Sequence, residues 1–224
     1  MKTVKSMIAD ILRREGGFTA DPDDPGHQLR VSRGHKWDSH CTNHGITQYT
    51  LSSYWKRQAT KHEVRMLTSA EAAEIYKHEY FYKPGFNNLP ATLQSALFDM
   101  GVNHGPRNAV RMLQTLCNKI ERELKVDGRL GFKTNSTVQK HMTNMGGWFN
   151  NALVEERIAF YERIIARKPS QAKYRNGWMR RANEFIVEDA GEIVVKKKLT
   201  TLADAVARIF PQFTLGGLLN VELS

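Results

Sequence analysis

The sequence predicts a mainly helical protein of the α+β class, and two observations support this. Apolar residues recur every three or four positions along most of the 224-residue chain, which places them on one face of a helix. Strand-like patterns are confined to short pieces around Thr19 and Ile46 and to residues 193–195. No long Ser- or Gly-rich linker divides the chain, so we expect its parts to pack together.

The same patterns give the expected elements. A first helix carries an apolar stripe from Val4 to Leu12, and Thr68 to Glu71 form a capping box that begins a later helix. The expected helices are 4–15, 47–57, 69–82, 90–103, 107–120, 133–142, 148–167 and one around 178–186, with a turn at 127–131. We expect the apolar stripe of each helix to face the hydrophobic core.

The composition is that of a soluble globular chain, with 41% hydrophobic and 25% charged residues. No apolar run reaches the roughly 18 residues that span a bilayer, and the N-terminus lacks a hydrophobic signal region. We therefore expect synthesis in a cytoplasm without an export signal. Cys41 and Cys117 lie far apart in sequence, which favours free thiols over a disulfide.

The formal net charge of +10 indicates a polyanionic partner. The basic residues are scattered over many helices, without zinc-finger spacing or an aromatic-rich sheet motif, so we expect no nucleic acid. An anionic bacterial envelope therefore remains as the expected polyanionic partner. Attraction to it raises the encounter rate and weakens as salt rises.

Glu15 is the first candidate for chemistry. It occupies the next position on the stripe of helix 4–15, and Gly16 and Gly17 follow it as helix-ending residues. Burial and the negative end of the helix dipole both disfavour the carboxylate, so each raises the pKa of Glu15. An acid protonated near neutral pH suits general acid catalysis. The alternative is an ordinary solvated residue at a helix end.

A loop rich in Asp and Pro, residues 21–26, follows and holds a second carboxylate at a defined place. Glu15-Gly16-Gly17-Phe18, this loop and a Thr-Asn, Gly-Ile-Thr run resemble the N-terminal signature of glycoside hydrolase family 108, phage and bacterial N-acetylmuramidases. The run consists of Thr42, Asn43, Gly45, Ile46 and Thr47. The resemblance continues through Leu89-Pro90, Phe98-Asp99, Val102 to Gly105, Leu113-Gln114 and Asp127 to Gly131.

The resemblance implies the domain organisation. We expect a lysozyme-like catalytic part at 1–90 with an insertion at 28–41, a helical peptidoglycan-binding part at 91–187 and an extension at 188–224. The two parts form a two-lobed helical body with a substrate groove between them. The extension carries a lysine run and an apolar stripe, read as a helix packing on the body or against an envelope membrane.

The resemblance also implies the roles. Glu15 is the catalytic acid, and Asp24 is preferred over Asp21 and Asp23 as the second carboxylate, with a turn-forming role as the alternative for each aspartate. Thr42 orients the attacking water. The expected substrate-binding residues are Tyr49, His44 and Asn103, the last also readable as a helix C-cap.

The insertion departs from the family pattern, as do His27 in place of a glycine and His44 in place of an aromatic residue. Its histidines and thiol raise three alternatives, namely a zinc site, a cationic loop facing substrate or envelope, and an inert elaboration. The residues concerned are His27, His35, His40, Cys41 and His44. Their spacing matches no familiar ligand pattern, so we expect no metal and no cofactor.

The sequence thus predicts a monomeric peptidoglycan hydrolase of the lysozyme type. It cleaves the β-1,4 bond between N-acetylmuramic acid and N-acetylglucosamine. As the family implies, it is a phage endolysin made in the host cytoplasm that acts on periplasmic peptidoglycan after release. Two alternatives stay open: a zinc amidase or peptidase that uses the histidine-rich insertion, and a non-catalytic wall-binding protein.

Overall fold

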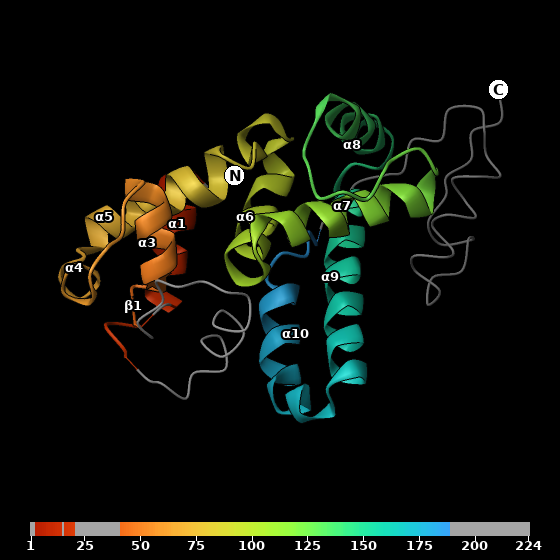
Figure 1. The fold of residues 1–224 in the computed structure, drawn as a ribbon. Helices are drawn as coiled ribbons and strands as arrows, with labels where there is room; N and C mark the ends of the chain where they lie inside the picture. The colour runs from red at the N-terminus through yellow and green to blue at the C-terminus, as the bar shows by residue number, and fades with distance from the viewer. Residues whose placement is uncertain (1–2, 15, 21–40, 189–224) are drawn as a thin grey trace, which may run out of the picture. The chain divides into compact units, whose positions relative to one another are not determined.

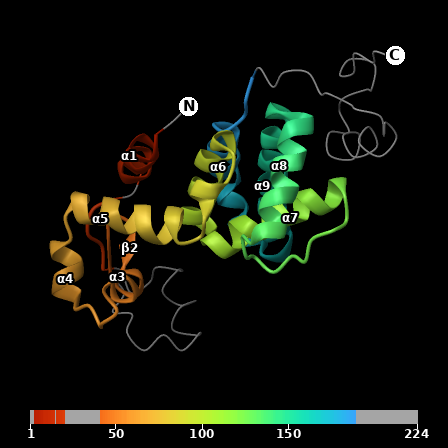
Figure 2. The same ribbon diagram turned by 90° about the horizontal axis from the view of Figure 1, so that it is seen from above.

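The computed structural model describes residues 3–14, 16–20 and 41–188, which divide into two compact units. The N-terminal unit lies within Lys2–Lys83, and the C-terminal unit starts at Pro84 (Figures 1 and 2). Both are built mainly of helices, and the one sheet among the described residues has two short strands. This confirms the predicted mainly α, lysozyme-like class. Over the described residues, no helix is long and apolar enough to cross a membrane.

The N-terminal unit begins with α1 (Val4–Arg14), which buries Met7, Ile8 and Ile11 as its stripe predicts. Strands β1 (Thr42–Asn43) and β2 (Ile46–Thr47) form an antiparallel hairpin. Its two turn residues, His44 and Gly45, have φ of 50° and 73°. Positive φ at both central positions is the geometry that closes a two-residue hairpin.

Three short helices follow the hairpin, and threonine begins each one. Helices α3 (Gln48–Trp55), α4 (Lys61–Met66) and α5 (Ser69–Ile75) are capped by the side chains of Thr47, Thr60 and Thr68. The last two caps are capping boxes with Glu63 and Glu71. A six-residue helix is too short to show an apolar stripe, which explains why the sequence pattern did not predict α4.

The helix predicted at 69–82 changes type halfway. After α5 the chain continues as the π-helix η1 (Tyr76–Tyr82). Two tyrosines of η1 reach the hairpin region, because the Tyr76 hydroxyl donates to the carbonyl of His44 at 2.9 Å and the Tyr80 hydroxyl lies 3.4 Å from Thr50 Oγ1. Such wide turns are rare and often lie at functional positions.

The C-terminal unit is a helical assembly around α7. Its elements are η2 (Phe86–Asn88), α6 (Ala91–His104), α7 (Pro106–Ile120), α8 (Phe132–Met145), α9 (Gly147–Arg167), η3 (Pro169–Tyr174) and α10 (Arg175–Asn183). Helix α7 packs against α6, α8 and α9, and α10 lies along α9 (Figure 1). Leu113, Leu116 and Cys117 of α7 are fully buried, as the stripe at 107–120 predicts.

A buried glutamine fixes the predicted turn before α8. Gln114 is 1% exposed, and its Nε2 donates to Asp127 Oδ1 and to the carbonyl of Arg129, both at 3.1 Å. Its Oε1 accepts the backbone N–H of Gly128 at 2.8 Å. The Leu113-Gln114 and Asp127-to-Gly131 motifs therefore hold one turn against α7.

Candidate functional site

Glu15 and Asp24, the predicted acid and second carboxylate, lie outside the described residues, so their roles stay predictions. The chain on both sides of Glu15 is described. Helix α1 ends at Arg14, and Gly16 and Gly17 are exposed, with open space around each.

A β-bridge connects the chain just after Glu15 to a second predicted residue. Thr19 and Thr42 are antiparallel partners, and each backbone N–H donates to the other's carbonyl at 2.9 Å. Beside the bridge, the Arg65 guanidinium lies 4.6 Å from the centre of the Phe18 ring, a cation–π distance. The segment after α1 is thus held against the first hairpin strand, and Thr42 is half-buried there.

The hairpin is fastened to α4 by Asn43. This residue is 5% exposed, and its Nδ2 donates to the carbonyls of Arg65 at 2.9 Å and Leu67 at 3.1 Å. A buried amide that lost these acceptors would carry an unmet desolvation cost of about 1–3 kcal/mol. Asn43 belongs to the motif that suggested the family, and its contacts give it a structural role.

The hairpin also carries His44 and leads directly to Tyr49. His44 stands in the turn, where the side-chain hydroxyl of Tyr76 donates a hydrogen bond to its carbonyl. Tyr49 lies in the first turn of α3 and is 44% exposed. Thr42, His44 and Tyr49 therefore belong to one hairpin-and-helix segment. Their contacts with substrate stay predictions.

Asn103 belongs to the C-terminal unit and lies in the last turn of α6. Its side chain is exposed, and Nδ2 donates to the carbonyl of Asp99 at 2.6 Å and to Asp99 Oδ2 at 3.2 Å. The C-cap of α6 is Gly105, with φ of 82°, so the C-cap reading of Asn103 is wrong. The asparagine is instead oriented by the preceding helical turn.

Asp99 is the centre of a buried ion network that the sequence reasoning missed. Arg157 Nη2 donates to Asp99 Oδ2 at 2.7 Å, and Arg181 Nη2 donates to Oδ1 at 2.9 Å. Asp99 is 3% exposed and Arg157 1%. The available signal was a charged residue at a core position within the helix expected at 90–103.

The network extends to His104 through a tyrosine. Arg157 Nε donates to Tyr161 Oη at 2.8 Å, and Tyr161 Oη lies 3.1 Å from His104 Nε2. Burial, followed by the charge of Arg157, lowers the pKa of His104 to about 4. The imidazole is therefore neutral near pH 7, and its Nε2 shares a hydrogen bond with the Tyr161 hydroxyl. Side chains of α9 and α10 thus connect to Asn103 through Asp99, and α9 connects to His104 through Tyr161.

Among the described residues, no group of three or more His, Cys, Asp and Glu side chains is arranged to hold a metal ion. His27, His35 and His40, which raised the zinc alternative, lie outside this part of the chain. Cys41 and Cys117 are both buried, and neither forms a disulfide. Burial raises the pKa of Cys117 to about 12, which makes it unreactive.

Residues 8–105 match the family model of glycosyl hydrolase 108. The N-terminal part of the chain is therefore similar to glycosyl hydrolase family 108. Residues 108–183 match the model of a predicted peptidoglycan domain. The chain thus carries one part similar to a glycosyl hydrolase and a second part similar to a peptidoglycan domain.

A solved structure, that of Brucella abortus SagA, is similar to this chain. The two are 28% identical over 81% of this chain and 90% of the other, with a TM-score of 0.63. No curated protein matches the chain.

With these matches, the protein is a glycoside hydrolase that acts on peptidoglycan. The expected boundary near residue 90 stays a prediction. The structural units divide between Lys83 and Pro84, and the match to the family model runs to residue 105.

Proposed function

We propose that the enzyme is an N-acetylmuramidase that cleaves the β-1,4 bond between N-acetylmuramic acid and N-acetylglucosamine. Glu15 is the general acid, Asp24 the second carboxylate, and Thr42 orients the attacking water. The observation that supports this most directly is the bridge between Thr19 and Thr42. It joins the segment that follows Glu15 to the strand that carries the third proposed residue.

The buried stripe of α1 supports the role of Glu15. Met7, Ile8 and Ile11 face the core, and one more helical step along this stripe leads to position 15. The pattern predicts that a carboxyl group at this position faces an apolar surface and the negative end of the helix, and both effects favour its protonated form. In this role it gives its proton to the leaving sugar oxygen as the glycosidic bond breaks.

Asp24 then stabilises the positive charge that develops on the sugar ring, either as a nucleophile or as the base that activates water. The separation of the two carboxylates distinguishes these outcomes, since about 5–5.5 Å favours retention and about 6.5–9.5 Å favours inversion. Thr42 supports either outcome as a hydroxyl group on the strand that is bridged to Thr19.

We also propose the setting of the reaction. As the resemblance to phage muramidases implies, the enzyme is a bacteriophage endolysin made in the host cytoplasm. It reaches periplasmic peptidoglycan after release and lyses the host cell, which is the basis of an antimicrobial activity.

The deciding experiment is Glu15→Gln. Glutamine keeps the size and polarity of the side chain and cannot act as an acid. General acid catalysis typically contributes on the order of 10²- to 10⁴-fold, so we expect clearing of purified wall to fall by at least about a hundredfold. Wall binding and melting temperature should stay near wild type. A variant that clears wall at more than about a tenth of the wild-type rate would refute this role of Glu15.

The products identify the bond that is cut. A muramidase releases new reducing ends on muramic acid, whereas an amidase or peptidase releases free amines. Release of amines alone, with activity lost in chelator and restored by zinc, would favour the histidine-rich insertion as a metal site instead.

A further inference from the structure

We propose that the turn at Asp127 to Gly131, with Phe132 beside it, is the peptidoglycan-contacting surface of the C-terminal domain. Phe132 stacks on a sugar ring of the glycan strand, and basic residues around the turn bind the carboxylates of its peptide stems. The inference rests on peptidoglycan as the partner and does not depend on which residue of the N-terminal unit is the acid.

The exposure of Phe132 is the first observation. It is the first residue of α8, and it is 89% exposed, more than any other large hydrophobic residue among those described. No ring contact or cation–π partner within the described part of the chain involves it. Packing therefore does not account for an aromatic ring at this position, and large rigid rings at low entropic cost are typical of binding surfaces.

The rigidity of the support is the second observation. The buried Gln114 holds the turn at Asp127, Gly128 and Arg129 through its hydrogen bonds, and its Nε2 also donates to Thr134 Oγ1 at 3.2 Å in the first turn of α8. One side chain thus binds the backbone of the turn before Phe132 and the side chain of Thr134 after it. A ring presented on an ordered backbone loses less conformational freedom on binding.

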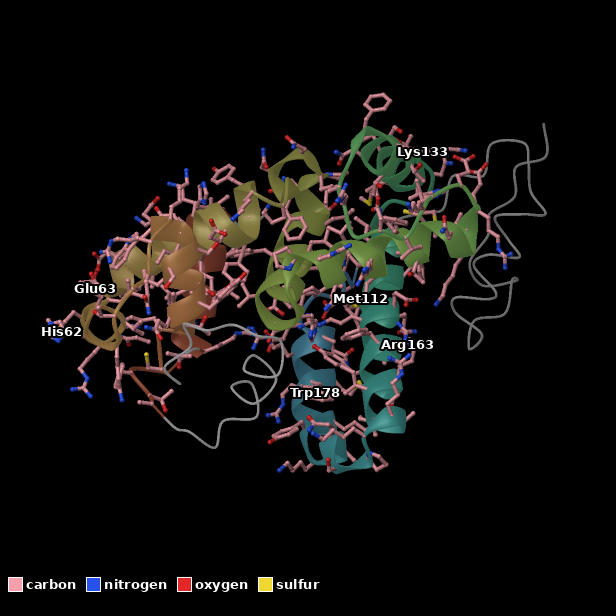
Figure 3. The ribbon with its side chains drawn as sticks, viewed as in Figure 1. His62, Glu63, Met112, Lys133, Arg163 and Trp178 are labelled. Carbon is pink, nitrogen blue, oxygen red and sulfur yellow. The ribbon has the colours of Figure 1, made fainter. Side chains whose placement is uncertain are left out.

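The charge around the turn is the third observation. Arg129 precedes Phe132 by three positions, and Lys133 follows it directly. Arg107 and Arg111 lie against Gly128, where an added Cβ would stand 2.5 Å and 3.2 Å from their Cγ atoms. All four side chains are exposed, and within the described residues none forms an ion pair (Lys133 is labelled in Figure 3). The only acid in the turn itself is Asp127.

These features fit one partner in particular. The axial C–H groups of an amino sugar form an apolar face that complements the negative face of an aromatic ring. The peptide stems of peptidoglycan carry free carboxylates, and these pair with arginine and lysine. A polyanion that offers no sugar ring for stacking would bind through the arginine and lysine side chains alone. A loss of binding when Phe132 is replaced therefore distinguishes peptidoglycan from such a polyanion.

The ring is tested by binding of the full-length protein to purified sacculi free of other anionic polymers, measured by sedimentation on ice. We expect Phe132→Ala and Phe132→Leu each to weaken binding by about fivefold or more, and Phe132→Trp to bind like wild type. Tyr174→Ala is the matched control, because Tyr174 is another exposed aromatic residue of this unit, at 44%, but stacks on Trp178. Melting temperatures should be equal, since Phe132 is almost fully exposed.

Two results would overturn the role of the ring. Wild-type binding by Phe132→Leu would show that any apolar side chain suffices, and an equal loss in Tyr174→Ala would show that the turn is not special. Stacking would also be contradicted if wild type bound dextran sulfate as tightly as sacculi and Phe132→Ala did not weaken binding. This result would favour a general polyanion-binding surface.

The charge is tested with Arg111→Gln combined with Lys133→Gln. We expect this double variant to bind sacculi more weakly and with a smaller salt dependence. Wild type should bind sacculi with amidated carboxylates more weakly than untreated sacculi. The double variant should bind amidated sacculi no more weakly than untreated sacculi. A further loss on amidated sacculi would mean that these cations do not face the stem carboxylates.

Catalysis distinguishes this proposal from the muramidase proposal. Phe132→Ala should release reducing ends from short soluble muropeptide oligomers at the wild-type rate, because the surface acts on the polymer. Glu15→Gln should bind sacculi normally and release few ends. A loss of turnover on soluble fragments in Phe132→Ala would contradict a binding role that is separate from the chemistry.

Discussion

Buried polar side chains in the C-terminal unit differ in how well they are paired. Glu156 is 1% exposed and lies 2.5 Å from Lys119 and 2.9 Å from Arg163, which Figure 3 labels on α9. Its charge is compensated by two cations. His141, in contrast, is 2% exposed, and its Nε2 has no hydrogen-bond partner within the described part of the chain. Such a group weakens the fold whenever it must take up a proton.

The acid response of the protein should therefore depend partly on His141. Burial lowers its pKa from 6.5 to about 4, while nearby Glu121 raises it and Lys140 lowers it. Below about pH 6.5 the unfolded chain takes up a proton that the folded state refuses, so stability falls as pH drops towards 4. A shift of this size corresponds to a loss of about 2 kcal/mol or more.

The test is His141→Leu, measured by urea unfolding at pH 7 and pH 5. We expect a smaller loss of unfolding free energy between the two pH values than in wild type. At pH 7 the variant should be at least as stable, since the unpaired nitrogen is gone. His104, which titrates in the same window, remains as a background in both proteins. An unchanged pH dependence would mean that the buried imidazole does not govern acid unfolding.

At the scale of elements, the turn between α7 and α8 is specified by a single glycine. Gly128 has φ of 75°, and a Cβ there would stand 2.6 Å from the backbone oxygen of Arg107. A backbone oxygen cannot swing aside like a side-chain end. The turn would have to leave α7, which breaks the hydrogen bond to Gln114.

Gly128→Ala should therefore lower the free energy of unfolding by about 2 kcal/mol, from strain at positive φ together with the clash. Gly131→Ala is the matched control, because Gly131 has open space around its Cβ position and no positive φ. We expect that control to change stability by less than about 0.5 kcal/mol. Thermal or urea unfolding of the two variants checks this, and equal stability would show that the turn adapts.

At the scale of the whole molecule, the net charge of +10 should set how fast the enzyme reaches its substrate. Peptidoglycan carries many carboxylates, and electrostatic attraction raises association rates by about 10- to 10³-fold at low salt. This attraction acts over roughly 10 Å at 0.1 M salt and over roughly 3 Å at 1 M. The rate should depend on salt even though the bond that is cut is neutral.

We expect clearing of purified wall to slow by about tenfold or more between low and high salt. Wall with amidated carboxylates is the control, since it should be cleared more slowly at low salt and with little further change as salt rises. Turbidity at several ionic strengths measures both. Equal salt dependence on the two walls would mean that salt acts on the fold or on the catalytic step.

The sequence by itself determined the local elements and the family. The stripe of α1 and the capping box of Thr68 and Glu71 are confirmed, because each depends on residues within a few positions of one another. Family 108 and the peptidoglycan domain were recognisable for a similar reason, since their motifs are short runs in a fixed order. The family thereby supplied the candidate site.

Only the tertiary structure decided which distant residues meet. Arg157 and Arg181 reach Asp99 from 58 and 82 positions away, and Asn43 of the hairpin binds the carbonyl of Leu67 across 24 positions. Periodicity shows that a position faces the core and does not show which partner it meets there. A buried charge or amide is stable only with a partner, and that partner is set by how the helices pack.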